Sequence, residues 1–229
     1  VATSQALKMH GGVAIEDIKK ENIEGLTQGL ANLQKHIENM KSFGQSIVIA
    51  FNKYANDTDA EITTVKEFCQ QHKVAFSLNE AFLKGGEGAI DLAKVVVEQI
   101  ENNPSKPVSF TYSDSDSIEE KVQKVAQNIY GASHIEFSKK AKKALQEISG
   151  TEMSSYPICI AKTQYSFSDD DKAYGVAKDF TLTVNDVIIN NGAEFIVLAS
   201  GSIMRMPGLP KNPQANKIDI VDGHIEGLS

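Results

Sequence analysis

Apolar residues in the first part of the chain alternate between helical spacing and short continuous runs. Within Glu21–Met40 the apolar side chains recur at the spacing of one helix face, which predicts an amphipathic helix. Ser46–Phe51 and Val74–Leu78 are continuous apolar runs, typical of buried parallel strands. Asp59–Lys73 has helical spacing, and another helix is predicted after the turn Gly85–Gly88. This order of strands and helices predicts a βαβ arrangement around a parallel sheet.

The first segment, Val1–Gly12, precedes the first predicted helix. Val1 reads as the end of a strand, and His10–Gly12 reads as a turn after a short apolar stretch. Gly25 and Gly29 lie inside the first predicted helix, where glycine either weakens the helix or allows another backbone to approach closely.

A second series of elements begins after the polar segment 102–107, whose two prolines predict a linker. Val108–Tyr112 is predicted to be a strand, and Ser117 followed by Glu120 has the spacing of a capping box at the start of a helix. We therefore expect an α/β protein in two parts, residues 1–103 and a smaller α/β domain at 104–229 with an extended C-terminal tail. The remaining predicted elements are a helix over 138–148, strands over 135–137 and 157–161, apolar segments over 180–189 and 195–200, and the tail from Met204.

The composition narrows the possible partners. The net charge of −7 repels phosphate backbones, which argues against nucleic acid as a partner. Apolar runs are strand-sized, so no membrane partner is expected. Arg205 is the single arginine, so an anion would be held by lysines, by backbone N–H groups or by another chain.

Cysteine and histidine spacing predicts neither a disulfide nor a metal site. Cys69 and Cys159 are far apart, and we interpret them as free, buried thiols in a reducing cytosol. The histidines are dispersed without ligand spacing, and His36 and His72 fall in predicted helices, where we interpret them as structural.

The run Ile47–Lys53 carries the first candidate chemistry. An apolar strand that ends in Asn52-Lys53 resembles the base-reading strand of P-loop GTPases, in which an Asn reads a purine edge and a Lys stem packs on the ring. Taken alone, an ordinary polar turn after a strand is the better interpretation. A GTPase-like function is disfavoured because the chain contains no GxxxxGK[ST] sequence, and the Gly85–Gly88 turn does not supply one.

Two aromatic residues follow successive predicted strands. Tyr54 comes after the first strand and Phe82 after the second. Because parallel neighbours end at the same edge of a sheet, the two rings could hold a flat heterocycle between them. A third polar loop, Lys162–Asp170, is dense in hydrogen-bonding groups, although a surface loop is the slightly favoured interpretation.

Several stretches, taken together, resemble the C-terminal part of formate–tetrahydrofolate ligase. They follow the order of that family and cover nearly the whole chain. The stretches are VATSQALKMHGG at Val1, GLANLQKHIEN at Gly29, IAFNKYANDTDAEI at Ile49, FLKGGEGAIDLA at Phe82, QNIYGA at Gln127, ICIAKTQYSFSDD at Ile158 and IMRMPGLPKNPQANKIDI at Ile203.

The resemblance implies a P-loop-type parallel sheet domain, of which residues 1–103 form the C-terminal half. It implies an ATP-dependent ligase with Mg²⁺, in which formate attacks the γ-phosphate and the resulting formyl phosphate formylates tetrahydrofolate. Tyr54, Ala55 and Phe82 match the folate-binding positions, and Asn52 and Lys53 would border the nucleotide base. A cytoplasmic, oligomeric enzyme is also implied.

The chain departs from the family pattern at the folate site. The family commonly has Phe-Pro in place of Tyr54-Ala55, Trp in place of Phe82 and a basic residue in place of Gln5. Loss of the larger ring and of the proline should weaken stacking by about 1 kcal/mol.

The resemblance also implies that the phosphate-binding loop lies upstream. We therefore expect this chain to need an N-terminal phosphate-loop portion as its partner and to be inactive alone. The alternative is a non-catalytic folate-binding or assembly module of a split ligase.

Overall fold

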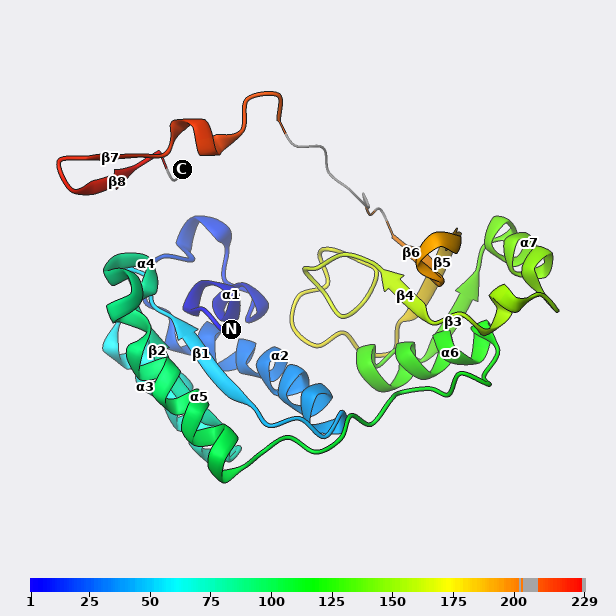
Figure 1. The fold of residues 1–229 in the computed structure, drawn as a ribbon. Coiled ribbons are helices and arrows are strands. Elements are labelled where there is room, and N and C mark those ends of the chain that lie inside the picture. The colour runs from blue at the N-terminus through cyan, green and yellow to red at the C-terminus, as the bar shows by residue number, and fades with distance from the viewer. Residues whose placement is uncertain (202, 204–209, 228–229) are drawn as a thin grey trace.

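The computed structural model describes residues 1–201, 203 and 210–227. Two groups of helices and strands surround separate hydrophobic cores. Figure 1 shows them side by side, joined by the irregular segment 103–117. We refer to residues 1–102 as the first lobe and to residues 118–201 as the second lobe. The predicted α/β class is confirmed, whereas the domain boundary at 103/104 stays a prediction.

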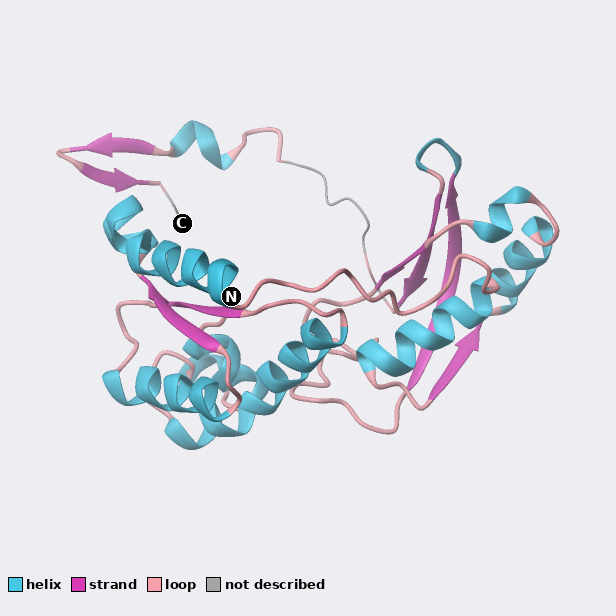
Figure 2. Cartoon of the chain, turned by 60° about the horizontal axis from the view of Figure 1, so that its bottom comes forward, coloured by secondary structure: helices cyan, strands magenta, loops and turns pink. Residues whose placement is uncertain are grey.

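The first lobe is built around a parallel pair of strands, β1 (Val48–Asn52) and β2 (Ala75–Asn79). Helices α2 (Ile23–Ser42) and α3 (Asp59–Gln71) pack on one side of this pair. Figure 2 shows helices on both sides of the strands, and α5 (Ile90–Asn102) contacts them from the other side. The predicted βαβ order is therefore confirmed in this lobe.

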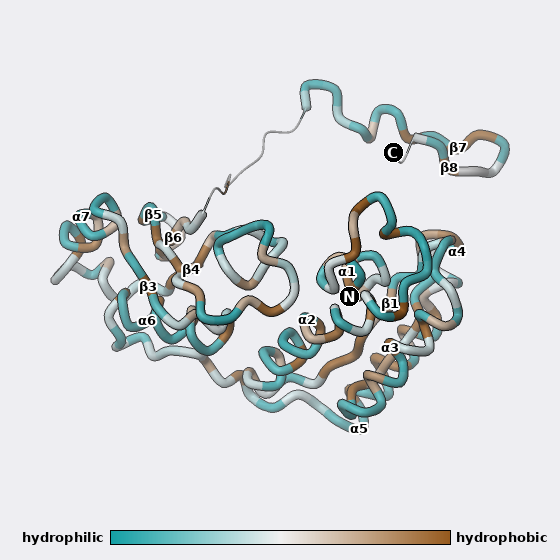
Figure 3. Tube along the Cα trace, turned by 180° about the vertical axis from the view of Figure 1, so that it is seen from behind, coloured by the Kyte–Doolittle hydropathy of each residue, from teal (hydrophilic) through white to brown (hydrophobic). Residues whose placement is uncertain are grey.

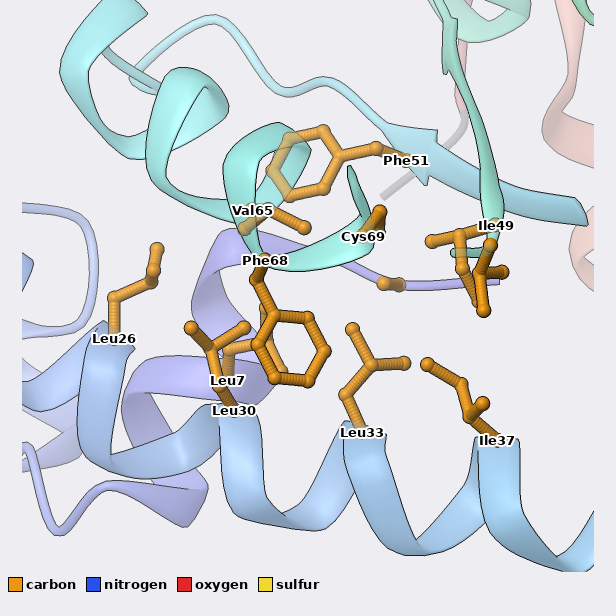
Figure 4. Packing of buried hydrophobic residues seen from close by; sticks show 12 residues of the cluster. Leu7, Leu26, Leu30, Leu33, Ile37, Ile49, Phe51, Val65, Phe68 and Cys69 are labelled. Atoms are coloured by element: carbon orange, nitrogen blue, oxygen red, sulfur yellow. The ribbon is translucent and has the colours of Figure 1, made fainter. Parts of the chain in front are cut away.

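The core of the first lobe forms where the apolar stripes of α2 and α3 meet β1. Each helix alternates hydrophilic and hydrophobic residues along its length, as Figure 3 shows. Apolar residues of both helices belong to the buried cluster of this lobe. A capping box at Thr58 and Glu61 starts α3. Figure 4 shows the interdigitated side chains, which include Leu7, Leu26, Leu30, Leu33, Ile37, Ile49, Phe51, Val65, Phe68 and Cys69.

The amino-terminal segment differs from its prediction. Ala2 does pair with Phe51, but Ser4–His10 forms helix α1, where the sequence predicts only a short apolar stretch before a turn. The Thr3 hydroxyl caps this helix by accepting from the Ala6 amide at 3.1 Å. The helix is short, and its apolar positions are too few to show a periodic pattern.

Glycines allow α1 and α2 to touch, as one of the two interpretations of Gly25 and Gly29 proposed. A Cβ on Gly29 would lie 1.8 Å from the Leu7 carbonyl oxygen, and a Cβ on Gly11 would lie 1.7 Å from the Gly25 carbonyl oxygen. Only a hydrogen at these positions lets the backbones approach so closely.

The connection from β2 to α5 contains helix α4 (Ala81–Lys84) and a 3-10 turn over Gly85–Ala89. The glycine-rich segment is thus a loop that leads into a helix, as expected. In contrast, the predicted strand Val108–Tyr112 is wrong, because these residues are irregular and pair with no strand of the described chain. Instead, the Ser109 amide donates to the Phe43 carbonyl, and the Lys106 amide donates to the Gly44 carbonyl.

The second lobe contains a mixed four-stranded sheet in the order β3-β5-β6-β4. The hairpin β5–β6 is antiparallel, while the outer strands pair in parallel, so the sheet is not a wholly parallel one. The expected capping box at Ser117 is present, and π turns Ala126–Tyr130 end the first helix. The elements are α6 (Ile118–Val125), β3 (His134–Phe137), α7 (Lys139–Ile148), β4 (Ile158–Ala161), β5 (Thr181–Asn190) and β6 (Phe195–Ser200).

The described part of the tail is not simply extended. Gln214–Lys217 forms a 3-10 turn, and β7 (Asp219–Val221) pairs with β8 (His224–Glu226) in a hairpin. The MRMPGL stretch at 204–209, with Arg205, lies outside the described residues. Further short 3-10 turns occur at Ile15–Asp17, Glu152–Ser155 and Asn191–Ala193.

Both cysteines are free, but only one is buried as predicted. Cys69 lies in the first core, where burial raises the pKa of its thiol to about 11. Cys159 is exposed, because the side chains of an outer strand alternate between the two faces of the sheet. No helix in the described ranges combines the length and apolar character needed to cross a bilayer.

Candidate functional site

The carboxyl ends of β1 and β2 form the first candidate site. Asn52 and Asn79 are paired in register at these ends. The Asn79 amide nitrogen donates to the Asn52 side-chain oxygen at 2.7 Å. The Asn52 side-chain nitrogen, Nδ2, makes no hydrogen bond within the described residues, so it remains able to donate to a ligand. Ligands of open parallel sheets bind at this kind of edge.

Lys53 directly follows β1 and lies near the carboxylate of Glu80. Its ammonium nitrogen lies 3.8 Å from the Glu80 carboxylate. Lys84 approaches the same carboxylate at 2.6 Å, and its hydrogen bond holds the pKa of Glu80 below the ordinary value. Lys53 is therefore the more weakly bound partner of Glu80, and its ammonium group can turn toward an incoming ligand.

An aspartate fixes the loop that carries Tyr54 and Ala55. The Tyr54 amide donates to one Asp57 carboxylate oxygen at 2.8 Å. The Ser4 hydroxyl donates to the other oxygen, so α1 and the loop are held by one side chain. The backbone is thus fixed while Tyr54 remains 39% exposed. Ala55 is also exposed.

A glycine contact positions the segment that carries Phe82. The Glu80 amide donates to the Gly88 carbonyl at 3.0 Å. A Cβ on Gly88 would lie 2.5 Å from the Glu80 carbonyl oxygen, so the turn can close only with glycine there. Phe82 projects from the short helix that follows and is 71% exposed.

The predicted aromatic residues therefore follow neighbouring strand ends, and neither is sealed inside the protein. Within the described chain, neither the Tyr54 ring nor the Phe82 ring packs against another aromatic ring. Two exposed rings beside amide and ammonium donors can accept a flat, polar heterocycle. Their role as a folate clamp, and that of Asn52 and Lys53 at a nucleotide base, stay predictions.

A second cluster, between the lobes, was not predicted from the sequence. His10 and His36 from the first lobe line a cavity of about 250 Å³ together with Tyr130 and Lys162 from the second. From the sequence alone, a surface loop is the slightly favoured interpretation of Lys162–Asp170, and His36 is interpreted as structural. No local signal could have joined them, because the four side chains come from four separate elements.

Comparison with known proteins identifies the family. A family model described as "Formate--tetrahydrofolate ligase" matches residues 1–229. The chain is 63% identical over 229 residues to a formate--tetrahydrofolate ligase from Parabacteroides distasonis. It is 56% identical over the same length to the protein of that name from Bacteroides fragilis and 46% identical to the one from Staphylococcus carnosus.

These matches cover 100% of the chain but 41% of each of the three relatives. They correct the positional part of the sequence-based expectation, since they give no support for assigning the chain to the C-terminal part or for an N-terminal portion as its partner. The extent of the matches is sufficient for the family itself: the chain belongs to the formate–tetrahydrofolate ligase family.

Proposed function

We propose that this chain forms part of an ATP-dependent ligase that makes 10-formyltetrahydrofolate from formate and tetrahydrofolate through formyl phosphate. Its role is to bind the folate ring system at Tyr54, Ala55 and Phe82 and the nucleotide base at Asn52 and Lys53. The observation that carries the proposal is the in-register parallel pairing of Asn52 with Asn79, after which both aromatic residues stand exposed.

Stacking accounts for the folate assignment. A pterin is flat and polar at its edges, so it gains from two ring faces and from nearby hydrogen-bond donors. The loop of Tyr54 is fixed through Asp57, and the segment of Phe82 is fixed through Gly88. Fixed backbones reduce the entropy that binding must overcome, which favours a site over a chance pair of exposed rings.

The nucleotide assignment rests on Asn52 and Lys53. The Asn52 side-chain Nδ2 can donate to an acceptor on a purine edge, while the Lys53 stem can lie along the ring face. The chain has no GxxxxGK[ST] sequence, so phosphate and Mg²⁺ would be bound by ligase residues outside these 229. We accordingly propose that the chain alone is inactive, and that the complete ligase is a cytoplasmic oligomer.

Titration calorimetry with tetrahydrofolate tests the folate site. Tyr54→Ala and Phe82→Ala should each weaken binding by about fivefold, because each removes about 1 kcal/mol of stacking. Phe110→Ala is the matched control: Phe110 is 82% exposed but lies in the linker segment, and its loss should leave the affinity unchanged. Equal affinities for all three variants would contradict the assignment.

An activity assay separates the ligase from the non-catalytic module. The chain should form no 10-formyltetrahydrofolate alone, and should contribute to its formation when combined with the rest of the ligase. Tetrahydrofolate binding without product in that combination would favour the module. Product formation by the isolated chain would refute the division of labour.

A further inference from the structure

The hairpin in the described part of the tail is formed by local interactions. Asp222 and Gly223 have φ angles of 51° and 81°, the positive pair that a type I′ turn needs, and β7 pairs with β8 on either side of them. The Gln214 side chain donates to the Gly227 carbonyl at 2.6 Å and closes the base of the hairpin. Within the described residues, every hydrogen bond of this unit joins residues of 213–227 to one another.

One face of this hairpin is apolar and uncovered. Ile220 pairs with Ile225, so both side chains point to the same face, and the alternation along a strand places Ile218 there too. We call these three residues the isoleucine face. Ile220 and Ile225 are 70% and 59% exposed. A two-stranded hairpin is marginally stable in water by itself, so packing of this face on another element would stabilise it.

The first lobe carries a second uncovered apolar face, on α5. Ile90, Val97 and Ile100 recur at intervals of seven and three residues, which places them on one side of the helix, and all three are exposed. Ala93, which is also exposed, lies between them at the same spacing. We call these four residues the α5 stripe.

The two faces match in polarity and size. Asp219 and Glu226 pair with each other and point to the face opposite the isoleucines, so no charge interrupts the isoleucine face. The α5 stripe is about 15 Å long at the rise of a helix, and a three-residue strand is about 10 Å long. A helix packed on the apolar face of a sheet is one of the common layer arrangements of proteins.

The position of the tail favours docking within one chain. Figure 1 shows the hairpin nearer to α4, the short helix that precedes α5, than to the second lobe. Figure 2 shows from another side that the hairpin lies by the first lobe. A tail that belongs to the same chain meets α5 at a high effective concentration, which favours this contact over docking on a second copy.

We propose that the β7–β8 hairpin docks with its isoleucine face on the α5 stripe of the same chain. The contact removes two apolar faces from water at once. The tail leaves the second lobe after β6, so this docking connects the two lobes at a second place besides segment 103–117. The inference does not depend on the proposed function.

A single tryptophan tests the docking. The chain contains no tryptophan, so the variant Ile225→Trp places one fluorescent indole on the isoleucine face of the full chain. We expect its emission at a shorter wavelength than in the urea-unfolded protein, and only weak quenching by acrylamide, because the docked indole is shielded from water. The emission of a fully solvated indole would overturn the proposal and leave both faces to a partner outside this chain.

A charge on the α5 stripe locates the contact. Val97→Asp, added to Ile225→Trp, should move the emission to longer wavelength and strengthen the quenching, because docking would bury the new carboxylate. Val108→Asp is the matched control: Val97 and Val108 are 53% and 52% exposed, but Val108 lies in segment 103–117, and its replacement should change neither signal. Ile100→Asp is a second variant on the stripe, and far-UV circular dichroism confirms that each protein is folded.

Dilution identifies the chain that provides the stripe. For docking within one chain, the emission of Ile225→Trp should not depend on protein concentration. A short-wavelength emission that is lost on dilution would place the hairpin on a second copy and overturn the proposal. Unchanged emission in folded Val97→Asp and Ile100→Asp proteins would equally contradict docking on α5.

Discussion

At the scale of single residues, a buried ion pair is the feature that most needs compensating partners. Lys8 and Glu61 meet at 2.8 Å, and their side chains are 1% and 0% exposed. Lys8 also donates to the Lys20 carbonyl at 2.8 Å, and the Asn22 amide donates to Glu61 at 3.2 Å. The pair therefore joins α1, the start of α2 and α3, and its charges are compensated by further hydrogen bonds.

Removing one partner should be far more harmful than removing both. Lys8→Met leaves the Glu61 carboxylate buried without its cation and should lower the free energy of unfolding by about 3–5 kcal/mol. The double variant Lys8→Met with Glu61→Leu should recover part of that loss, because no uncompensated charge remains. Urea denaturation followed by circular dichroism measures both.

An exposed pair provides the control for this experiment. Lys143 and Glu147 lie 3.9 Å apart with side chains 78% and 65% exposed. Lys143→Met should change stability by less than about 0.5 kcal/mol. Similar losses for Lys8→Met and Lys143→Met would show that the buried pair is not structurally important.

At the scale of elements, the contact between α1 and α2 determines where the amino-terminal segment lies. The contact is made by backbone on backbone at Gly11, Gly25 and Gly29. It places His10 at the second cavity and Ser4 beside Asp57, so both candidate sites depend on it.

The variant Gly29→Ala compares the stability lost at this contact with the stability gained from the higher helix propensity of alanine. Alanine is the better helix former by about 1 kcal/mol, so an isolated helix would gain stability. Here the new methyl group would meet the Leu7 carbonyl, and we expect a net loss of about 3 kcal/mol in thermal or urea unfolding.

Gly86→Ala is the matched control, since a Cβ there would have no neighbour within 4 Å and the residue is not among the positive-φ glycines. Its stability should be unchanged or slightly raised. A Gly29→Ala protein as stable as Gly86→Ala would disprove the close packing of α1 on α2.

At the scale of the whole molecule, hydrogen bonds between the lobes determine their arrangement. The Asn32 side-chain Nδ2 donates to the Gly175 carbonyl at 3.1 Å, and the Asn39 side-chain Nδ2 donates to the Ile129 carbonyl at 2.9 Å. Both asparagines are buried polar residues of α2, and the acceptors belong to the second lobe. Leaving such donors unpaired is costly, so the lobes are expected to stay in contact.

Acid should weaken this contact through His10. Burial lowers the pKa of His10 below the ordinary value of 6.5, and its Nδ1 accepts from the Gly175 amide. The unfolded chain therefore binds this proton at a higher pH than the folded chain does. Because the unfolded state binds more protons below about pH 6.5, the free energy of unfolding should fall as the pH decreases through that value.

His10→Asn isolates the contribution of this group. The asparagine side-chain oxygen can accept from the Gly175 amide in place of Nδ1 but does not titrate. Urea unfolding between about pH 8 and about pH 5 should show a shallower loss of stability for the variant than for the parent protein. Identical pH dependence in the two proteins would exclude His10 as the responsible group.

The local pattern of the sequence by itself determined most elements of this protein. Helices α2, α3 and α7 were predicted because one face of each is apolar, and β1 and β2 because both faces of a central strand are buried. The residues at the ends of β1 and β2 could also be identified, since parallel strands end at a common edge. The resemblance of the chain to the formate–tetrahydrofolate ligase family is confirmed over residues 1–229.

Only the tertiary structure determined what depends on contacts between distant segments. The helix at Ser4–His10 is fixed by glycine contacts with α2, and the irregular 108–112 segment is held by carbonyls of residues 43 and 44 rather than by a strand. The cavity of His10, His36 and Lys162 likewise arises only when the lobes meet. Spacing along the chain reports local periodicity, whereas these contacts join separate segments of the chain, for which the sequence pattern contains no signal. The hydrogen bonds between the lobes join residues more than a hundred positions apart.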